Sequence, residues 1–448
     1  MKRYEKFKDT NQIWLPGLPN HWDTIKIKYQ FEEISDKNHA DEVLLVASQH
    51  KGVVPKSIYG LRTVEATKGL ELFKRVMVGD FVISLRSFQG GLEYAYYQGI
   101  ISPAYTILRC KNKEFNQYYR YLFKSAMFIK LLTLCVTGIR EGQNIDYSTL
   151  KKFSIPVPPR SEQDQIVRYL DWQTSRINKL IKGYKRQIEL LEERKQTIID
   201  LYSTQGIDKN VKFKKSGTYW LPEIPEHWNM VYSKQLFAQR KDKAFPDDVQ
   251  LTASQKYGIL SQDEFMKLEG RRVTVVMTGN DILKHVGKGD FVISMRSFQG
   301  GLEYSRTEGK ISSAYVMLIP NRGKVCDDYF RWLLKSTPYI KALQGTADLV
   351  RDGQALRYAN FAKISLPEIP LNEQKEIAER IQTETEKIDN AIPIFEKQIA
   401  LLQEYRTRLI SDVVTGQVDV RGIEIPEYVT EDEALTIDME VEKDADQS

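Results

Sequence analysis

The residue types that usually perform catalysis are few and scattered in this sequence. None of the five histidines has a histidine partner four residues away, and the three cysteines show no paired spacing, so neither a zinc site nor a disulfide framework is expected. The chain has no GxxxxGK[ST] phosphate loop, no glycine-rich strand-to-helix turn for a nucleotide cofactor, and no Asn-Pro-Pro-Tyr stretch that would grip a flipped base. We therefore expect no catalytic residue, no metal site and no cofactor bound by this chain. His21 and His227 stand before a tryptophan in two similar motifs, where packing or hydrogen bonding is the expected role.

A sixteen-residue stretch that occurs twice shows that the chain contains an internal repeat. GDFVISLRSFQGGLEY at 79–94 returns at 289–304 with a single change, from Leu85 to Met295. Other matched motifs follow in the same order along the chain. They are WLPGLPNHW and WLPEIPEHW, ASQHKGV and ASQKYGI, SPAYTIL and SSAYVML, YYRYLFKS and YFRWLLKS, REGQ and RDGQ, and SIPVPPRSEQDQI and SLPEIPLNEQKEI.

Each copy of the repeat has two unlike parts. Short β-branched and aromatic runs with glycine-rich turns indicate strands in a mixed α/β globular domain. After a proline-rich break, apolar residues recur at alternating spacings of three and four, which is typical of a coiled-coil helix. The residues expected to pair the two helices are Ile177, Ile181, Tyr184, Ile188, Leu191, Ile198 and Tyr202 in the first, and Ile388, Ile392, Phe395, Ile399, Leu402, Leu409 and Val413 in the second. Two amphipathic helices packed on unrelated cores are the alternative interpretation.

Local signals predict where the helices begin and where they are disturbed. Ser161, followed three residues later by Asp164, fits a capping box at the first helix, and Asn372 is the expected cap of the second. Gly183 and Pro393 lie about halfway along the two helices and predict a kink or break there.

These patterns divide the chain into five segments. Residues 1–155 and 206–366 are the expected globular domains, 156–205 and 367–420 the helical spacers, and 421–448 an acidic tail that we expect to be disordered.

The net charge is distributed unevenly along the chain. Residues 422–448 carry ten acidic residues against one lysine, which leaves a net charge of +14 on the rest. A basic body is compatible with a polyanion partner, although an ordinary solvated surface is the alternative. No stretch reaches the roughly 20 apolar residues of a membrane span, and the N-terminus lacks the apolar core of a signal peptide, so we expect a cytoplasmic protein.

The motifs, taken together with their order and duplication, resemble the specificity (S) subunits of Type I restriction-modification systems. The resemblance rests on GDFVIS, SPAY, the GQ turn, and IPVPPRSEQ and LPEIPLNEQ, which lead into long helices that end in STQGI and TGQV. It runs from Trp14 to about Val420. It implies a pseudo-two-fold molecule in which two target recognition domains, each reading half of a split double-stranded DNA sequence, are separated by a pair of long antiparallel helices.

The resemblance also implies partners and a division of labour. The chain would be non-catalytic, and its helices would dock two methyltransferase (M) subunits that bring S-adenosylmethionine. A restriction/translocase (R) subunit with ATP and Mg would complete an adenine-specific DNA methyltransferase and ATP-dependent endonuclease. A self-contained DNA methyltransferase or nuclease with an unfamiliar site, and a protein-binding scaffold, are the alternatives.

Comparison of the two copies indicates which residues select bases. If the domains read different half-sites, base-selecting residues lie where the copies differ, and shared residues are scaffold or contact phosphates or a common base. The copies differ most between 51–78 and 256–288. The candidates from divergent positions are Lys51, Lys56, Tyr59, Arg62 and Asn144 in the first copy, and Lys256, Tyr257, Gln262, Arg271, Arg272 and Arg357 in the second. The shared candidates are Arg86, Ser87, Gln89, Arg140 and Gln143, with Arg296, Ser297, Gln299, Arg351 and Gln354. A structural turn is the alternative role for the shared set.

Overall fold

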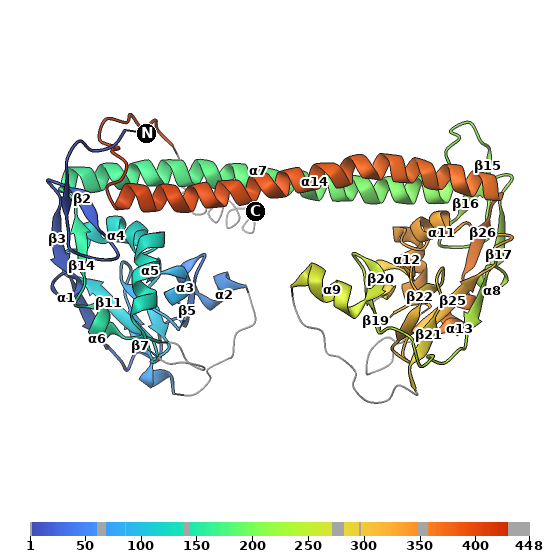
Figure 1. Ribbon diagram of the computed structural model, residues 1–448, viewed down its shortest axis with the longest axis horizontal. Coiled ribbons are helices and arrows are strands. Elements are labelled where there is room, and N and C mark those ends of the chain that lie inside the picture. Colours follow the sequence, from blue (N-terminus) through green and yellow to red (C-terminus); the bar gives the residue numbers. More distant parts are fainter. Residues whose placement is uncertain are drawn as a thin grey trace, which may run out of the picture. The chain divides into compact units, whose positions relative to one another are not determined.

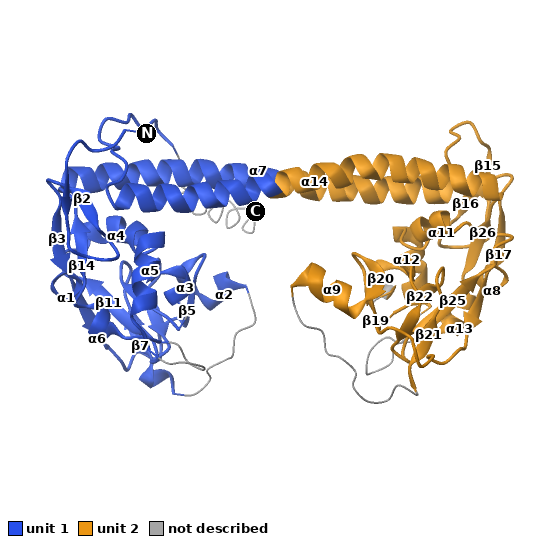
Figure 2. Ribbon diagram, viewed as in Figure 1, with its two compact units in different colours: residues 1–184, 397–448 blue, residues 185–396 orange. Residues whose placement is uncertain are grey.

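The computed structural model describes residues 2–60, 69–85, 87–137, 144–270, 282–294, 297–346 and 357–428. The chain forms two compact units, shown in different colours in Figure 2. One unit combines residues 1–184 with 397–448, and the other comprises 185–396. Each unit therefore contains one globular domain and one half of each of the two long helices. The division into the five predicted segments stays a prediction.

The globular domain of the first unit precedes the first long helix (Figure 1). Its strands and helices are β1 (Phe7–Asp9), β2 (Gly17–Pro19), β3 (Asp23–Lys26), α1 (Ile27–Gln30), β4 (Phe31–Ile34), β5 (Leu45–Ser48), β6 (Gly52–Pro55), α2 (Lys56–Tyr59), β7 (Lys74–Val76), β8 (Phe81–Ile83), α3 (Ser87–Gly90), β9 (Glu93–Tyr94), β10 (Gly99–Ile101), β11 (Thr106–Cys110), α4 (Asn116–Leu122), α5 (Ala126–Leu134), β12 (Val136–Thr137), β13 (Asn144–Ile145), α6 (Tyr147–Leu150) and β14 (Ser154–Val157).

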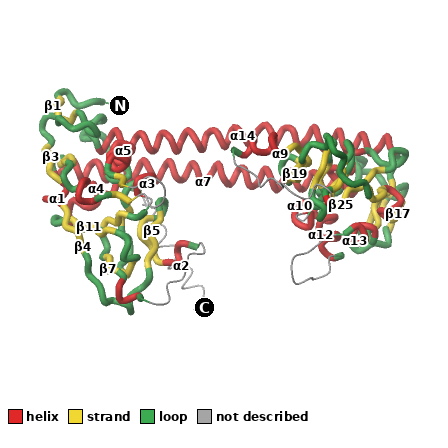
Figure 3. Tube along the Cα trace, turned by 60° about the horizontal axis from the view of Figure 1, so that its bottom comes forward, coloured by secondary structure: helices red, strands yellow, loops and turns green. Residues whose placement is uncertain are grey.

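The second globular domain lies between the two long helices in the sequence and repeats most of these elements. They are β15 (Phe213–Lys215), β16 (Glu223–Pro225), β17 (Asn229–Tyr232), α8 (Ser233–Leu236), β18 (Phe237–Arg240), β19 (Leu251–Ser254), β20 (Gly258–Ser261), α9 (Gln262–Glu269), β21 (Lys284–Val286), β22 (Phe291–Ile293), α10 (Ser297–Gly300), β23 (Glu303–Tyr304), β24 (Gly309–Ile311), β25 (Val316–Pro320), α11 (Asp327–Leu333), α12 (Thr337–Gly345), α13 (Tyr358–Ala362) and β26 (Ser365–Glu368). Figure 3 shows this mixture of helix and strand within each unit.

A four-stranded antiparallel sheet with the same strand order is the centre of both domains. The order is β4-β11-β8-β9 in the first and β18-β25-β22-β23 in the second. The FVI of the repeated GDFVIS motif forms β8 and β22, and both phenylalanines, Phe81 and Phe291, are fully buried. They meet Phe31 and Phe237 edge to face, with ring centroids 5.7 and 5.4 Å apart. The repeated motif thus supplies a framework strand, as predicted.

Successive side chains of the central strand enter two different cores, because strand residues alternate between the faces of a sheet. Phe81 and Ile83 belong to the main core, to which α4 and α5 contribute. Val82 belongs to a smaller core with Val53 of β6 and Val76 of β7. The β5–β6 hairpin is therefore held on the sheet by its own apolar contacts.

Two long helices, α7 (Arg160–Gln205) and α14 (Leu371–Val414), pack against each other within each unit. In the first unit, Ile177 and Ile181 of α7 share a core with Leu409 and Val413 of α14. All fourteen residues expected to pair the helices are buried or half-buried. The predicted apolar stripe is therefore confirmed.

Polar contacts show that the two helices run antiparallel. Arg406 of α14 donates to Asn178 of α7 at 2.7 Å, and Lys195 of α7 pairs with Asp389 of α14 at 2.5 Å. Residue numbers thus rise along one helix as they fall along the other. Both partners of the second pair lie at positions equivalent to the first, 211 residues apart in the repeat. The helix pairing in the second unit therefore repeats that in the first, as the duplication in the sequence predicts.

The helices begin earlier than the capping signals predicted. The Glu162 amide donates to the Pro159 carbonyl at 2.9 Å, and the Gln374 amide donates to the Pro370 carbonyl at 3.0 Å. Pro159 and Pro370 therefore occupy the cap positions, and Ser161 and Asn372 lie inside the first turn. Proline is tolerated there because the helix has no acceptor for its missing N–H. The prediction that Ser161 and Asn372 are caps was wrong.

Neither long helix is interrupted at the residue expected to disturb it. α7 continues through Gly183 and α14 through Pro393. A glycine costs about 1 kcal/mol relative to alanine in a helix, and a proline about 3 kcal/mol. The apolar stripe on both sides outweighs these costs, so the helices do not break at these residues, and a kink there stays a prediction.

The chain after α14 stays packed on the first unit as far as residue 428. Gln165 of α7 donates to the carbonyls of Val420 and Ile423, and the Tyr428 hydroxyl donates to the Arg168 carbonyl. Residues 421–428, at the start of the predicted acidic tail, therefore pack against α7. Residues 429–448 of that tail lie outside the described residues. Within the described parts of the chain, no helix is both long enough and apolar enough to cross a membrane.

Candidate DNA interface

Several of the predicted DNA-contacting residues have positions in the structure, and the others lie outside the described residues. The latter are Arg62, Arg86, Arg140, Gln143, Arg271, Arg272, Arg296, Arg351 and Gln354. Their roles stay predictions. The described candidates lie on the β5–β6 and β19–β20 hairpins, on the helices that follow these hairpins, on the repeated turn, and next to α6 and α13.

The hairpin tip and the repeated turn SFQGG lie side by side in each domain. A Cβ atom on Gly90 of the turn would lie 3.0 Å from the Gln49 side chain at the hairpin tip. In the second domain, a Cβ on Gly300 would lie 2.6 Å from Gln255. The divergent hairpin tip and the shared turn therefore belong to one edge of each domain.

The residues after the hairpin tip differ between the domains in structure as well as in sequence. Exposed Lys51 donates from Nζ to the Ile58 carbonyl at 2.8 Å and so joins the hairpin to α2, a single turn that contains half-buried Lys56 and Tyr59. The second domain instead has an eight-residue helix, α9, which begins at half-buried Gln262.

Lys256 and Tyr257 stand at the tip of the second hairpin. The Lys256 ammonium lies 4.9 Å from the centre of the Tyr257 ring, and the lysine is exposed. A cation beside an aromatic ring offers both charge and a stacking surface to a nucleic acid. This pair is therefore the best-defined divergent candidate of the second domain.

The two serines of the repeated turn have a structural role. Ser87 and Ser297 are buried, with 0% and 1% exposure, and each accepts a hydrogen bond at 2.8 Å from the backbone amide of Ser84 or Ser294. Their side chains are not available to DNA, so the prediction that they contact DNA was wrong. Gln89 and Gln299, two residues further on, are exposed and remain candidates.

Two candidates flank the GQ motif. Asn144 is exposed on β13, which packs against α3 of the repeated turn, so it lies near the same edge. Arg357 is exposed directly before α13, and its backbone amide donates to the Asn360 side chain at 3.0 Å. Asp146, its counterpart, accepts a bond from the Ser148 amide and caps α6. Part of the difference between the copies here is therefore a difference in helix capping.

A buried ion pair beneath the turn was missed by the sequence reasoning. The Lys124 ammonium donates to the Glu93 carboxylate at 2.6 Å, to the Gly90 carbonyl at 2.9 Å and to the Gln49 carbonyl at 3.3 Å. Burial raises the pKa of Glu93 to about 7, which Lys124 opposes, and burial lowers the pKa of Lys124.

The second domain repeats this ion pair. Lys335 donates to Glu303 at 2.8 Å and to the Gln255 carbonyl at 3.2 Å. Burial raises the pKa of Glu303, which Lys335 opposes. One feature of the sequence could have indicated these ion pairs. Both copies place a glutamate in the apolar motif GGLEY and a lysine in the apolar motif LFKS or LLKS.

A second missed feature fixes the aspartate of the repeated GDFVIS motif. Asp80 and Asp290 are buried, and each forms a two-pronged bond with an arginine. The arginine is Arg109 of β11 in the first domain but Arg240 of β18 in the second. Equivalent carboxylates in the two domains are thus neutralised by arginines from different strands. The aspartate of the GDFVIS motif therefore has a structural role in both domains.

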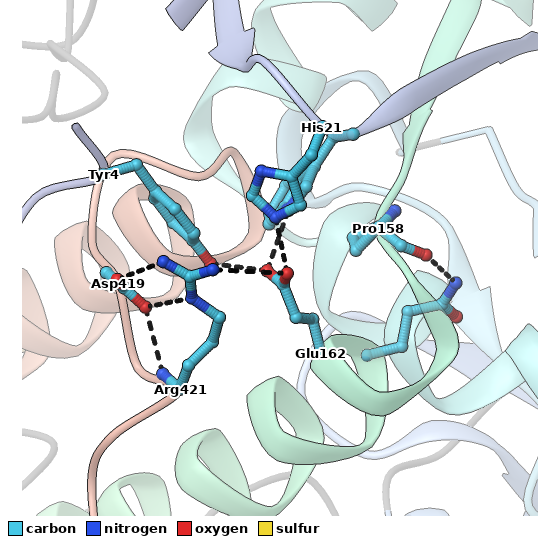
Figure 4. A network of polar contacts seen from close by, with 8 residues as sticks. Tyr4, His21, Pro158, Glu162, Asp419 and Arg421 are labelled. Carbon is cyan, nitrogen blue, oxygen red and sulfur yellow. Dashed lines mark hydrogen bonds and ion pairs between the residues drawn. The ribbon is translucent and has the colours of Figure 1, made fainter. Parts of the chain in front are cut away.

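Glu162 at the start of α7 joins the long helix to the first domain (Figure 4). Its carboxylate accepts hydrogen bonds from the Tyr4 hydroxyl at 2.8 Å and the Trp22 indole at 2.9 Å, and it contacts His21 at 2.5 Å. Arg421, which pairs with Asp419, approaches to 3.9 Å. Burial of the Tyr4 side chain is the largest cause that raises the pKa of its hydroxyl, and the hydrogen bond to the Glu162 carboxylate raises it further.

The start of α14 has the same junction. Glu373 accepts from the Trp228 indole at 2.9 Å and contacts His227 at 2.8 Å. His21 and His227 therefore have the predicted hydrogen-bonding role. Across the described parts of the chain, no group of three or more histidine, cysteine, aspartate or glutamate residues is arranged to hold a metal.

Known proteins resemble this chain over most of its length. The family model of the Type I restriction modification DNA specificity domain matches residues 63–190. Two specificity subunits of Methanocaldococcus jannaschii, the putative MjaX and the MjaVIII type I restriction enzyme subunits, are each 24% identical to this chain, over 445 and 436 residues. The matches cover 93% of this chain and 97% and 98% of those proteins.

A solved structure has the same fold. A chain from a structure of the type I R-M system matches with a TM-score of 0.64 and 14% identity, and the match covers 90% of this chain and 99% of that chain. The duplicated domains and paired helices described above extend over the same part of the chain that these relatives match. The chain is thus similar over most of its length to DNA specificity subunits of Type I restriction-modification systems.

Proposed function

We propose that the chain is the DNA sequence-specificity subunit of a Type I restriction-modification complex and that each globular domain reads one half of a bipartite duplex target. The duplication carries this proposal. The two domains share their central sheet, their repeated turn and their junction with the long helices, but they differ at the hairpin tip and in the helix that follows. A common framework with two different edges suits a target with two different halves.

The chain itself is non-catalytic, as specificity subunits are, and chemistry comes from its partners. On the family's pattern, α7 and α14 dock two methyltransferase subunits with S-adenosylmethionine, and a restriction/translocase subunit joins with ATP and Mg. Leu190 of α7 and Leu401 of α14 support two equivalent docking faces. They lie outside the pairing stripe, are 42% and 48% exposed, and occupy equivalent positions of the repeat.

Methylation mapping tests the proposal directly. The full chain is co-expressed with methyltransferase subunits, and adenine methylation is located by sequencing the host DNA. We expect methylation at one bipartite motif, only when this chain is present. Methylation by the purified chain alone would contradict a non-catalytic role.

Binding to DNA provides an independent test that separates DNA recognition from protein scaffolding. The affinity of the chain for a duplex with two correctly spaced half-sites should fall steeply as the salt concentration rises, because phosphate contacts release counterions. A duplex with scrambled half-sites is the control. Equal affinity for both duplexes would contradict sequence recognition.

A further inference from the structure

We propose that Lys124 and Lys335 are positioning residues for base reading, each of which fixes the reading hairpin of its own domain against the repeated turn. This inference rests on the proposed function. Neither residue belongs to the segments that differ between the copies, and neither needs to touch DNA.

The bonds of Lys124 connect three separate pieces of the first domain. Lys124 follows α4, and its ammonium uses its three donors on the hairpin tip, the repeated turn and β9, through the Gln49 carbonyl, the Gly90 carbonyl and the Glu93 carboxylate. Lys335 makes the corresponding bonds to Gln255 and Glu303. The hairpin tip is thereby tied to the framework two residues before exposed Lys51, and in the second domain one residue before exposed Lys256.

The turn itself is held rigidly against the same part of the domain. Gly91 and Gly301 have φ of +79° and +78°, and a Cβ there would lie 2.0 and 2.1 Å from the carbonyl oxygens of Phe123 and Leu334. The turn is thus packed directly on the residue that precedes each lysine. The lysine joins the hairpin to an already fixed turn.

Stability alone does not explain why both domains bury this ion pair. Glu93 and Glu303 have 0% and 2% exposure, and one carboxylate oxygen of each has no hydrogen-bond partner among the described residues. Burying the carboxylates costs desolvation even though the lysines stay partly exposed, and well-packed apolar residues of similar size are often at least as stable. Apolar residues would not supply hydrogen bonds to the backbone of the hairpin tip.

An anchor to backbone carbonyls suits a domain whose reading residues vary. The Gln49 and Gln255 carbonyls are available whatever side chains follow them, so one device serves two hairpins with different sequences. Base discrimination requires side chains placed to within a fraction of an ångström. Loss of the anchor should therefore weaken discrimination without removing any reading side chain.

The test uses the full chain assembled with its methyltransferase subunits. Lys124→Met and Lys335→Met remove the ammonium but keep the length of the side chain. Lys130→Met and Lys341→Met are the matched controls, because these lysines are exposed and occupy equivalent positions of the repeat. The methylation rate on the cognate duplex is compared with the rates on duplexes that carry one substituted base in one half-site or the other.

We expect Lys124→Met to lower discrimination at one half-site roughly tenfold, and Lys335→Met to do so at the other half-site. Each variant should leave the opposite half-site within about twofold, and the controls should leave both unchanged. Unchanged discrimination, or an equal loss at both half-sites from either variant, overturns the positioning role. A wild-type complex without sequence preference would instead refute the proposed function.

A double variant separates positioning from stability. In Lys124→Met/Glu93→Gln, the unpaired buried carboxylate is removed, so thermal stability should recover relative to Lys124→Met alone. Discrimination should stay relaxed because the bonds to Gln49 and Gly90 are still absent. Recovery of discrimination together with stability would show that the lysine acts only on folding and would overturn the proposal.

Discussion

Two glutamates, Glu162 and Glu373, join the start of each long helix to its globular domain. Each accepts the indole N–H of a tryptophan that is fully buried, Trp22 or Trp228. A buried donor that loses its acceptor pays its full desolvation cost, so these carboxylates matter more for stability than their number suggests. Helix and domain should therefore unfold together.

We expect Glu162→Ala to lower the free energy of unfolding by about 3 kcal/mol and Glu373→Ala by about 2 kcal/mol. Both glutamates contact a histidine and a tryptophan, but Glu162 also accepts a hydrogen bond from the Tyr4 hydroxyl, so its loss should cost more. Urea unfolding followed by tryptophan fluorescence measures the change. Glu192→Ala, at an exposed position of α7, is the control. Equal effects of Glu162→Ala and Glu192→Ala would contradict the junction.

The buried carboxyls beneath the repeated turn predict a pH dependence of stability. The pKa of Glu93 is raised from its usual 4.5 to about 7 by burial, and the pKa of Glu303 is raised for the same reason. The folded state then binds protons more tightly than the unfolded state. This contribution to stability is present below pH 4.5 and is lost as the pH rises through about 7.

Relative to Glu93→Gln/Glu303→Gln, the wild-type free energy of unfolding should therefore fall between pH 5 and pH 8. Urea unfolding at several pH values provides the comparison, and the variant serves as the baseline for all other titrating groups. A constant difference between the two proteins over this range would count against the raised pKa values.

At the level of elements, the long helices are continuous although each contains a poor helix former. Gly183 is exposed, and a Cβ added there would meet no atom within 4 Å. Gly183→Ala should therefore raise the free energy of unfolding by about 0.5–1 kcal/mol, because alanine loses less backbone entropy in a helix. Thermal unfolding measures the gain.

Gly91→Ala is the opposite control, since its positive φ and the nearby Phe123 carbonyl leave no room for a methyl group. It should destabilise the first domain. A destabilising Gly183→Ala would indicate that α7 needs a flexible point at this position after all.

The elements also show how far sequence reasoning reaches in this chain. The apolar stripe and the framework strand were predictable, because their signals are periodic or repeated within one segment. The Lys124–Glu93 pair was not, because its partners lie 31 residues apart and meet only after the turn packs on Phe123. The ion pairs of Arg109 and Arg240 could not be predicted by comparing the copies. The two arginines bind equivalent aspartates but lie on strands that are not equivalent. The helix starts were misjudged because Pro159 and Pro370 took the cap positions.

At the level of the whole molecule, duplication allows parts of one domain to be tested in the other. The divergent segments 51–78 and 256–288 begin at equivalent hairpins and end after equivalent strands. β7 pairs with β10 through Val76 and Gly99, and β21 pairs with β24 through Val286 and Gly309, in the same register. Lys256 aligns with His50, so a segment exchanged from His50 onward should meet the same neighbours at both ends.

Replacing residues 50–78 by the 256–288 sequence should change one half of the recognised motif toward the other half, because divergent residues select the bases. Methylation mapping of the assembled complex gives the motif in one experiment. Exchanging 79–94 with 289–304, which alters a single residue, is the matched control and should leave the motif unchanged. An unchanged motif after the first exchange would place base selection outside these segments, and the exposed Gln89, Gln299, Asn144 and Arg357 would be tested next.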